Sequence, residues 1–345
     1  MSCRSGSGGR RGSGSPVNFE AYTSVRVLIT GGLGFIGSNI AQKLVRYGAR
    51  ITIVDSLHPL YGGNLANIAE IRDQVTLCVG DYRDQSLLKP LVRDTDIIFN
   101  LAGQVSYIDS SKIPFEDLDL NCRGPLQLLE LCRELNPEVR VVFASSRLVL
   151  GKIVSQPVQE DHPTEPLSLY GVHKLVTEKY HRLYAETYGV RTTVLRITNP
   201  YGERQQLKHN KYSLPGWFMR LAFERKPIRI FGDGGQLRDY VYATDLADAF
   251  LAVGLGATAA GEVYNCGSGR SVPFREMAET VVRVLGQGTI AYVPWPPDYE
   301  RVETGDVNID VGKLRGMTGW NPSVSLEEGI ERMYRYFATR WRLYL

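Results

Sequence analysis

A tyrosine and a lysine four residues apart, Tyr170 and Lys174, are the residues whose types and spacing best suggest chemistry. They stand at the start of a predicted helix over 169–188, so both side chains share one helix face. A phenol with an ordinary pKa near ~10 is a poor base at neutral pH, but a fixed ammonium and a positively charged hydride acceptor nearby would together favour the phenolate. The pair could then take a proton from a hydroxyl group while hydride leaves the same carbon. An isolated pair of this kind is more often a surface feature, so the surrounding elements must show whether this pair belongs to an active site.

A glycine turn supplies a place for a hydride acceptor. The predicted strand Val25–Thr30 runs into Gly31, Gly34 and Gly37, which open a helix over Phe35–Tyr47. Glycines at this spacing permit a tight turn, a close backbone approach to a pyrophosphate and close contact between helix and strand, and the helix N-terminus offers free N–H groups. The pattern predicts a dinucleotide site.

Asp55 ends the next predicted strand, at about the distance expected for a residue that holds ribose hydroxyls. A carboxylate there accepts from the 2′-hydroxyl of NAD and repels the 2′-phosphate of NADP. No Arg or Lys occurs in residues 56–58, so we expect NAD. A strand-end turn residue is the alternative interpretation.

Short apolar runs alternate with helical patterns from residue 25 to about residue 200, which predicts a doubly wound parallel α/β sheet. The strands are expected at 25–30, 51–54, 75–79, 97–101, 139–144 and 192–197, and further helices at 115–135 and 169–188. Gly124-Pro125 predicts a kink in the first of these helices. We expect three parts: a disordered tail over 1–24, a Rossmann NAD-binding domain over 25–200, and a smaller mixed α/β substrate domain over 201–345, interleaved with the first.

Composition limits the partners. The 345 residues are 43% hydrophobic, and 40 Lys and Arg nearly balance 37 Asp and Glu, which favours neither a nucleic acid nor a membrane. No apolar run reaches the roughly 18 to 20 residues of a membrane span. The five cysteines are scattered, as is typical of reduced thiols, so we expect a soluble, cytoplasmic protein. No histidine clusters with carboxylates, so we expect no metal site.

The order of these motifs resembles the extended short-chain dehydrogenase/reductase family, whose members include NAD-dependent nucleotide-sugar epimerases and dehydratases. The resemblance covers about residues 25 to 340 and rests on the GxxGxxG spacing, on Asp81 in Gly80–Asp84 and on Leu101-Ala102-Gly103. It implies that Tyr170 and Lys174 also contact the cofactor. The remaining implied cofactor residues are Phe35, Ile36, Asp81, Tyr82, Leu101, Ala102, Gly103 and Asn121.

The same resemblance completes the catalytic set. Members carry a Ser or Thr four residues before the Tyr of a V-Y-G motif, and Ser146 stands at that spacing before Leu150 in Val149-Leu150-Gly151. Ser146 is therefore implied to orient the reacting hydroxyl. Two departures put the sugar specificity in doubt: Leu150 replaces the usual Tyr, and Arg147 stands where ordinary epimerases carry a small residue.

The remaining motifs resemble the family's nucleotide-sugar site. Arg196–Gly202 resembles the segment whose Asn, here Asn199, approaches the substrate, and Arg238 is implied to bind the diphosphate with Arg301 as its partner. For Arg229 and Arg301 a solvated surface charge is an equal alternative. The full set of implied substrate residues is Gln104, Ser106, Ser146, Arg147, Asn199, Arg229, Arg238 and Arg301. The family also implies a homodimer through the helices at 115–135 and 169–188.

The resemblance narrows the reaction. Dehydratases of this family place an Asp-Glu pair after the catalytic residue because elimination needs an extra acid and base, and decarboxylases carry a Glu there. Arg147 and Leu148 occupy these positions. We therefore expect an epimerase acting on carbon 4 of a UDP-hexose or UDP-hexuronic acid. A CDP-sugar 2-epimerase is the alternative, followed by a dehydratase, a ketoreductase or a non-catalytic NAD-binding scaffold.

Overall fold

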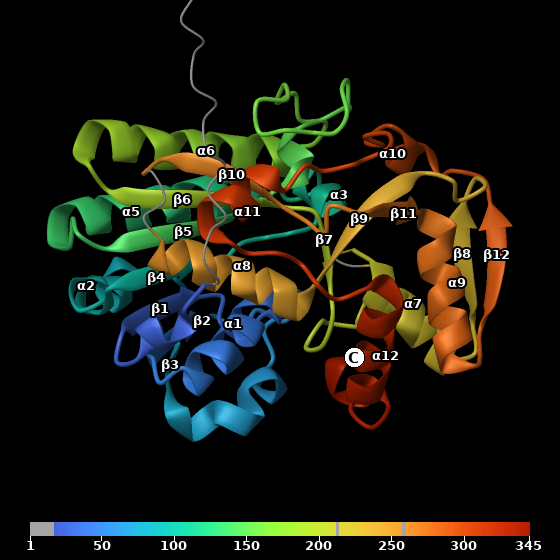
Figure 1. Ribbon diagram of the computed structural model, residues 1–345, viewed down its shortest axis with the longest axis horizontal. Helices are drawn as coiled ribbons and strands as arrows, with labels where there is room; N and C mark the ends of the chain where they lie inside the picture. Colours follow the sequence, from blue (N-terminus) through green and yellow to red (C-terminus); the bar gives the residue numbers. More distant parts are fainter. Residues whose placement is uncertain (1–16, 212–213, 257–259) are drawn as a thin grey trace, which may run out of the picture.

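A seven-stranded parallel sheet is the centre of the computed structural model, which describes residues 17–211, 214–256 and 260–345 (Figure 1). Its strands are runs rich in Val, Ile and Leu, as expected where both faces of a sheet are covered. In spatial order they are β10 (Glu262–Cys266), β6 (Arg191–Ile197), β5 (Arg140–Ser146), β4 (Ile97–Asn100), β1 (Arg26–Thr30), β2 (Arg50–Asp55) and β3 (Val75–Val79). The predicted doubly wound sheet is confirmed, and the strand that the sequence analysis missed is β10.

Helices cover both faces of this sheet. Alternate residues of β1 point to opposite layers, so Val27 and Ile29 pack in one hydrophobic core and Leu28 in another. The first core includes α1 (Phe35–Arg46) and α8 (Ala243–Leu255), and the second includes α2 (Gln85–Arg93), α5 (Gly124–Leu135) and α6 (Leu169–Tyr188). The sheet order reverses direction at β1 and β4, and a crevice for ligands is expected where strand order reverses.

A smaller mixed region follows residue 200 and has its own core (Figure 1). Phe218, Met277 and Met333 lie in this core. The region's elements are β7 (Asn199–Tyr201), α7 (Leu214–Phe223), β8 (Pro227–Phe231), β9 (Leu237–Tyr242), β11 (Ser271–Pro273), α9 (Phe274–Leu285), β12 (Thr289–Val293), α10 (Pro297–Glu300) and α12 (Leu326–Phe337). Strands β11, β9 and β7 form one sheet, and β12 pairs with β8. Between these segments the chain returns to the large sheet and adds α8, β10 and α11 (Gly312–Thr318), which contacts β10.

The long helix expected at 115–135 is divided. It consists of α4 (Pro114–Leu118), a π-helical turn at Asp119–Arg123 and α5, so the irregularity predicted from Gly124-Pro125 takes the form of a π turn. A side chain at Gly124 would collide with the ring of Tyr82. The glycine therefore allows this helix to pack against the segment after β3. Short helices complete the chain: α3 (Tyr107–Ser110) and 3₁₀ helices at Phe19–Tyr22, Leu65–Gln74, Arg147–Val149 and Trp341–Tyr344.

The disordered tail expected over residues 1–24 extends too far along the chain. Residues 1–16 lie outside the described residues, but Phe19–Tyr22 forms a 3₁₀ helix. Tyr22 is fully buried, and its hydroxyl donates to the carbonyl of Leu251 on α8 at 2.9 Å. The aromatic residues, which the Gly/Ser/Arg-rich segment before them lacks, bury enough apolar surface to dock this part of the chain.

Candidate active site

The glycine turn between β1 and α1 leaves no room for side chains. Gly31 has a φ of +71°, and a Cβ on it would lie 2.9 Å from the backbone nitrogen of Ala102. A Cβ on Gly37 would lie 2.5 Å from the carbonyl oxygen of Gly31. Gly34 is the N-cap residue of α1 and offers no side-chain cap to the helix N-terminus. The turn therefore provides the bare backbone and free N–H groups that a pyrophosphate requires.

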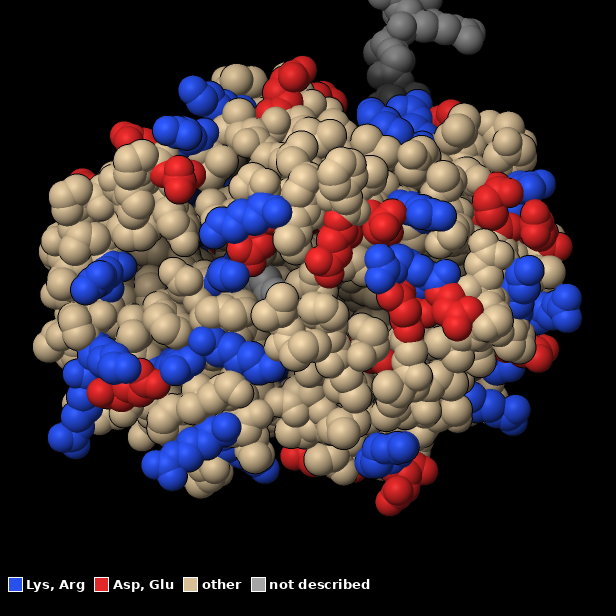
Figure 2. All heavy atoms as spheres, turned by 180° about the vertical axis from the view of Figure 1, so that it is seen from behind, with Lys and Arg blue, Asp and Glu red and all other residues tan. Residues whose placement is uncertain are grey.

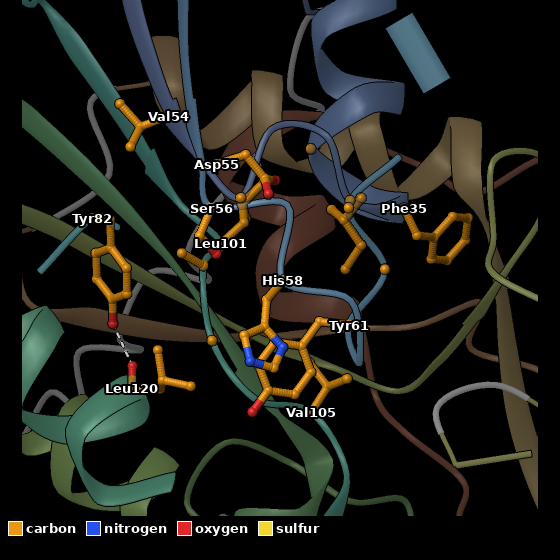
Figure 3. A pocket seen from close by; sticks show the side chains of 18 of the residues that line it. Phe35, Val54, Asp55, Ser56, His58, Tyr61, Tyr82, Leu101, Val105 and Leu120 are labelled. Carbon is orange, nitrogen blue, oxygen red and sulfur yellow. Dashed lines mark hydrogen bonds between the residues drawn. The ribbon is translucent and has the colours of Figure 1, made fainter. Parts of the chain in front are cut away.

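A cavity of about 280 Å³ opens beside this turn (Figure 3). Most of the predicted cofactor residues line it: Gly31, Gly34, Phe35, Ile36, Gly37, Asp55, Asp81, Tyr82, Leu101, Ala102 and Gly103. The predicted Asn121, Tyr170 and Lys174 are not among the lining residues. Asn121 and Lys174 lie beside Gly103, where a Cβ would come 2.5 Å from the Asn121 Oδ1 atom and 3.7 Å from the Lys174 Nζ atom.

Asp55 stands at the end of β2 in the wall of this cavity. Its carboxylate accepts hydrogen bonds from the backbone N–H groups of Leu33 at 3.0 Å and Leu57 at 2.9 Å. Burial raises the pKa of Asp55, and these two N–H donors oppose the rise. The carboxylate thus fixes the glycine turn, and its contact with a ribose hydroxyl remains a prediction.

Asp81 and Tyr82 follow β3. The guanidinium of Arg83 donates to both carboxylate oxygens of Asp81 and holds the pKa of that carboxyl below its usual range. The Tyr82 hydroxyl donates to the carbonyl of Leu120, which fixes the ring against the π turn (Figure 3).

The sequence analysis missed a loop that forms another part of the cavity wall. His58 stacks on Tyr61 with ring centroids 4.5 Å apart, and the Tyr61 hydroxyl donates to Glu116 at 3.0 Å (Figure 3). Gln205 and Gln206, beyond β7, also line the cavity. These residues lie in irregular segments, which carry no periodic signal.

The predicted catalytic residues lie where β5 ends and α6 begins. The Ser168 hydroxyl caps α6 by accepting from the N–H of Gly171 at 3.2 Å, and the helix then places Tyr170 and Lys174 on one buried face. The Ser146 side chain, at the end of β5, lies close enough to Tyr170 to oppose the rise of its pKa. Lys174 donates to the carbonyl of Ala144 at 3.1 Å, and its Nζ atom lies 5.8 Å from the centroid of the Tyr170 ring. The structure therefore brings together the three side chains that the sequence singled out.

Burial sets the protonation of this group. It raises the pKa of Tyr170, although the Ser146 side chain opposes the rise, and it lowers the pKa of Lys174 to about 8, although the carboxylate of Asp117 opposes that fall. The Lys174 ammonium is not among the groups that shift the pKa of Tyr170, so the expected phenolate depends on the second expected positive charge, that of the hydride acceptor, and stays a prediction. Desolvation disfavours both charged forms, so a further positive charge is needed to lower the pKa of Tyr170.

A second layer of polar residues supports Lys174. Asn121 donates through Nδ2 to the carbonyl of Gln104 at 2.9 Å and to Asp117 at 3.1 Å, and Asp117 also contacts the Nδ1 atom of His173 at 2.5 Å. The Asn121 Oδ1 atom is buried and has no hydrogen-bond partner among the described residues. An unpaired acceptor beside Gly103 fits a polar ligand at the inner end of the cavity. Asp117 and His173 were missed, because neither belongs to a recognised motif.

A buried ion pair holds the end of β5 in place. Arg196 on β6 donates to Glu178 on α6 through Nε at 3.0 Å and Nη2 at 2.8 Å, and Ser145 also donates to Glu178. Both members of the ion pair are almost fully buried. Arg196, which the sequence placed at the start of a substrate motif, is therefore a positioning residue for the strand that carries Ser146.

The predicted substrate residues divide into two groups. Arg147 and Arg238 lie near each other, since each arginine's charge lowers the pKa of Tyr107 and of Tyr240. Asn199 joins them by accepting from the Arg147 Nε atom at 3.4 Å. Arg229 and Arg301, in contrast, are exposed.

Arg301, the expected second arginine at the diphosphate, is exposed, and its role there stays a prediction. Arg238 pairs with Glu303 at 2.5 Å, and Arg301 lies 4.0 Å from Asp298 in a solvent-exposed pair. Gln104 and Ser106 are buried and bond to each other, since the Gln104 Nε2 atom donates to the Ser106 carbonyl at 2.7 Å. Their expected contact with the substrate remains a prediction.

Comparison with known proteins identifies the family of this chain. A model described as the NAD dependent epimerase/dehydratase family matches residues 27–267. This chain belongs to that family. As a member, it uses NAD as its cofactor, in agreement with the glycine turn and Asp55.

Relatives match this member of the epimerase/dehydratase family over nearly its whole length. The UDP-glucose 4-epimerase of Mycolicibacterium smegmatis is 30% identical over 92% of this chain and 99% of its own. The epimerase Mth375 of Methanothermobacter thermautotrophicus superposes with a TM-score of 0.87 at 28% identity, covering 94% of this chain and 95% of its own. The UDP-glucose 4-epimerase of Thermotoga maritima, solved with UDP-glucose, has a TM-score of 0.81 at 30% identity, covering 91% and 99% of the two chains.

Basic and acidic side chains are interspersed over the face in Figure 2. Within residues 17–211, 214–256 and 260–345, no three His, Cys, Asp or Glu residues form a group that could hold a metal ion. In the same part of the chain, no helix is both long and apolar enough to cross a membrane.

Proposed function

We propose that this enzyme inverts carbon 4 of a UDP-hexose or UDP-hexuronic acid through a 4-keto intermediate. The observation that carries the proposal is the meeting of cavity and catalytic side chains at Gly103. A Cβ there would lie 3.7 Å from the Lys174 Nζ atom, and Lys174 shares a helix face with Tyr170. One end of a cofactor bound in the cavity would thus lie beside Lys174 and Tyr170, the groups proposed to transfer the proton.

The roles of the side chains follow from this arrangement. Bound NAD supplies a hydride acceptor that returns the hydride to the same carbon. Tyr170 takes the proton of the 4-hydroxyl and gives it back, and Ser146, whose side chain acts on Tyr170, orients that hydroxyl. Lys174, held by the Ala144 carbonyl, keeps a positive charge near the phenol.

Elimination lacks the groups that it needs. A dehydratase or decarboxylase requires an additional acid or base beside the reacting carbon. The residues after Ser146 are Arg147 and Leu148, and neither supplies a carboxylate. This favours inversion, as do the relatives named as UDP-glucose 4-epimerases.

The test is to incubate the enzyme with UDP-glucose, UDP-galactose or UDP-glucuronic acid in deuterated water and to follow the products by NMR. We expect the carbon-4 epimer without deuterium at carbon 5 and without net consumption of NAD. Loss of water or carbon dioxide would contradict the proposal, and so would inversion only of a CDP-sugar at carbon 2. In Tyr170→Phe, turnover should fall about 100- to 10,000-fold while NAD stays bound.

We further propose a homodimer in which α4, α5 and α6 pack against the same helices of a second copy. Large apolar side chains are exposed there: Phe115 is 81% exposed, Leu183 51% and Tyr188 48%. Light scattering should report a dimer for the parent protein and a monomer for Leu183→Glu. Leu343→Glu, at an equally exposed apolar residue of the C-terminal 3₁₀ helix, is the control and should stay dimeric. A monomeric parent protein would refute the interface.

The cytoplasm is the compartment that we propose. Cys78, Cys122, Cys132 and Cys266 are all free thiols, as is usual in a reducing environment.

A further inference from the structure

Arg147 is a cation without an anionic partner among the described residues. Its Nη1 atom donates to the Thr304 hydroxyl at 3.0 Å and its Nε atom to Asn199 at 3.4 Å, so both partners are neutral. The described part of the chain contains no carboxylate within ion-pair distance of it. Burial lowers the pKa of Arg147 to about 10, and the neighbouring charge of Arg238 acts in the same direction. An arginine remains charged at neutral pH even so, and a desolvated charge is stabilised by a counter-ion.

Arg238 already has its counter-ion. Its Nη2 atom pairs with Glu303, and its Nη1 atom donates to the carbonyls of Leu237 at 2.8 Å and Gly305 at 3.0 Å. The charged groups that act on the Arg147 guanidinium are Arg238 and Glu303. Two cations and one carboxylate leave a single net positive charge. A monoanion would neutralise this charge, whereas the negative charge of a diphosphate is larger than it.

A buried hydroxyl without a partner points to the same place. Tyr240 on β9 is 7% exposed, and its hydroxyl oxygen has no hydrogen-bond partner among the described residues. The charges of Arg238 and Arg147 both act on this phenol. A buried donor that lacks a partner costs stability unless a ligand or water satisfies it. A carboxylate has two oxygens, so it can accept from a guanidinium and a phenol together.

The position of Arg147 in the chain relates it to the reacting carbon. It directly follows Ser146, whose side chain acts on Tyr170. In a hexuronic acid the carboxylate is attached to carbon 5, which is bonded to carbon 4. When the 4-hydroxyl lies at Ser146 and Tyr170, the carboxylate carbon is two bonds from the reacting carbon, and Arg147 is the next residue along the chain.

We propose that Arg147 is the specificity residue of this site and that, with the Tyr240 hydroxyl, it binds the carboxylate of a UDP-linked hexuronic acid. The inference rests on the proposed function and selects the acid over the neutral hexose. It gives Arg147, which stands where ordinary epimerases carry a small residue, a role in substrate choice.

The experiment measures the ratio of kcat/KM for UDP-glucuronic acid to kcat/KM for UDP-glucose. The parent enzyme should prefer the acid, and Arg147→Met should lower the ratio about 10- to 100-fold, the range expected for hydrogen bonds to a charged group. Arg147→Lys, which keeps the charge but loses the planar fork, should lie between the two. Arg283→Met, at an exposed arginine of α9, is the matched control and should leave the ratio unchanged.

A binding measurement keeps the test independent of turnover. In a Tyr170→Phe background, calorimetry compares UDP-glucuronic acid, UDP-glucose and UDP with and without Arg147→Met. A selective loss of affinity for the acid supports the inference. An equal loss for all three ligands would assign Arg147 to the diphosphate and overturn it, as would an unchanged ratio. Failure of the parent enzyme to epimerise either sugar would instead refute the proposed function.

Discussion

Removal of the Arg196 guanidinium tests how the end of β5 is held. In Arg196→Met, the carboxylate of Glu178 stays buried, at 3% exposure, and loses donors at 2.8 Å, 3.0 Å and 3.2 Å. The hydroxyl of Ser145 is the side-chain donor that remains. An uncompensated buried charge of this kind costs about 3–5 kcal/mol of unfolding free energy. Such a loss is a large part of the ~5–15 kcal/mol that stabilises a typical domain.

The same strand offers a matched control. Arg191 on β6 pairs with Glu138, but these side chains are 53% and 74% exposed. Because solvent screens such a pair, Arg191→Met should cost less than about 1 kcal/mol. Urea unfolding of both variants, followed by circular dichroism, measures the difference.

A double variant separates the charge from the loss of packing. In Arg196→Met with Glu178→Met no unpaired charge is left, so the cost should be smaller than in Arg196→Met alone. The reasoning is refuted if Arg196→Met and Arg191→Met destabilise the protein equally. It is also refuted if the double variant is less stable than the single one.

Three further predictions concern the cavity and its inner end. Asp55→Ala should weaken NAD binding about 10- to 100-fold in calorimetry, because a charged hydrogen-bond acceptor is lost; unchanged or tighter binding would refute its role. Gly103→Ala should lower kcat about 100-fold, because its Cβ would enter the inner end of the cavity. Gly316→Ala, whose Cβ meets nothing within 4 Å, should be silent, and equal rates in the two variants would contradict the argument. The Lys174 ammonium, with a pKa of about 8, loses its proton as pH rises, so kcat should fall on the alkaline side. Asp117→Asn removes a carboxylate that raises this pKa, so the fall in kcat should move to lower pH. An unmoved pH profile would exclude an effect of Asp117 on the pKa of Lys174.

The parts of the fold that depend on local pattern could be predicted from the sequence. Apolar runs identified six strands of the central sheet, and the glycine spacing identified the turn that lines the cavity. Tyr170 and Lys174 were found because their spacing follows from the helix that carries them. The seventh strand, β10, was missed because its residues join the sheet only through long-range pairing with β6.

The charges of the site depended on tertiary structure and could not be predicted. Arg238 pairs with Glu303, which lies in the loop after α10 and belongs to none of the motifs recognised in the sequence. The pKa of Tyr170 is raised because its surroundings are buried, which no spacing reveals. Asp117 and His173 pair across two helices, and neither residue's own segment marks it.

The late strand β10 has a consequence for synthesis on the ribosome. Until residue 255 has emerged, the face that α8 covers lies bare, and until residue 266 has emerged, β6 is an open edge of a parallel sheet. Unpaired strand edges and uncovered apolar surface promote aggregation of nascent chains. Most of the chain must therefore be translated before the glycine turn and α6 belong to a complete sheet, and the growing polypeptide exposes an apolar face until then.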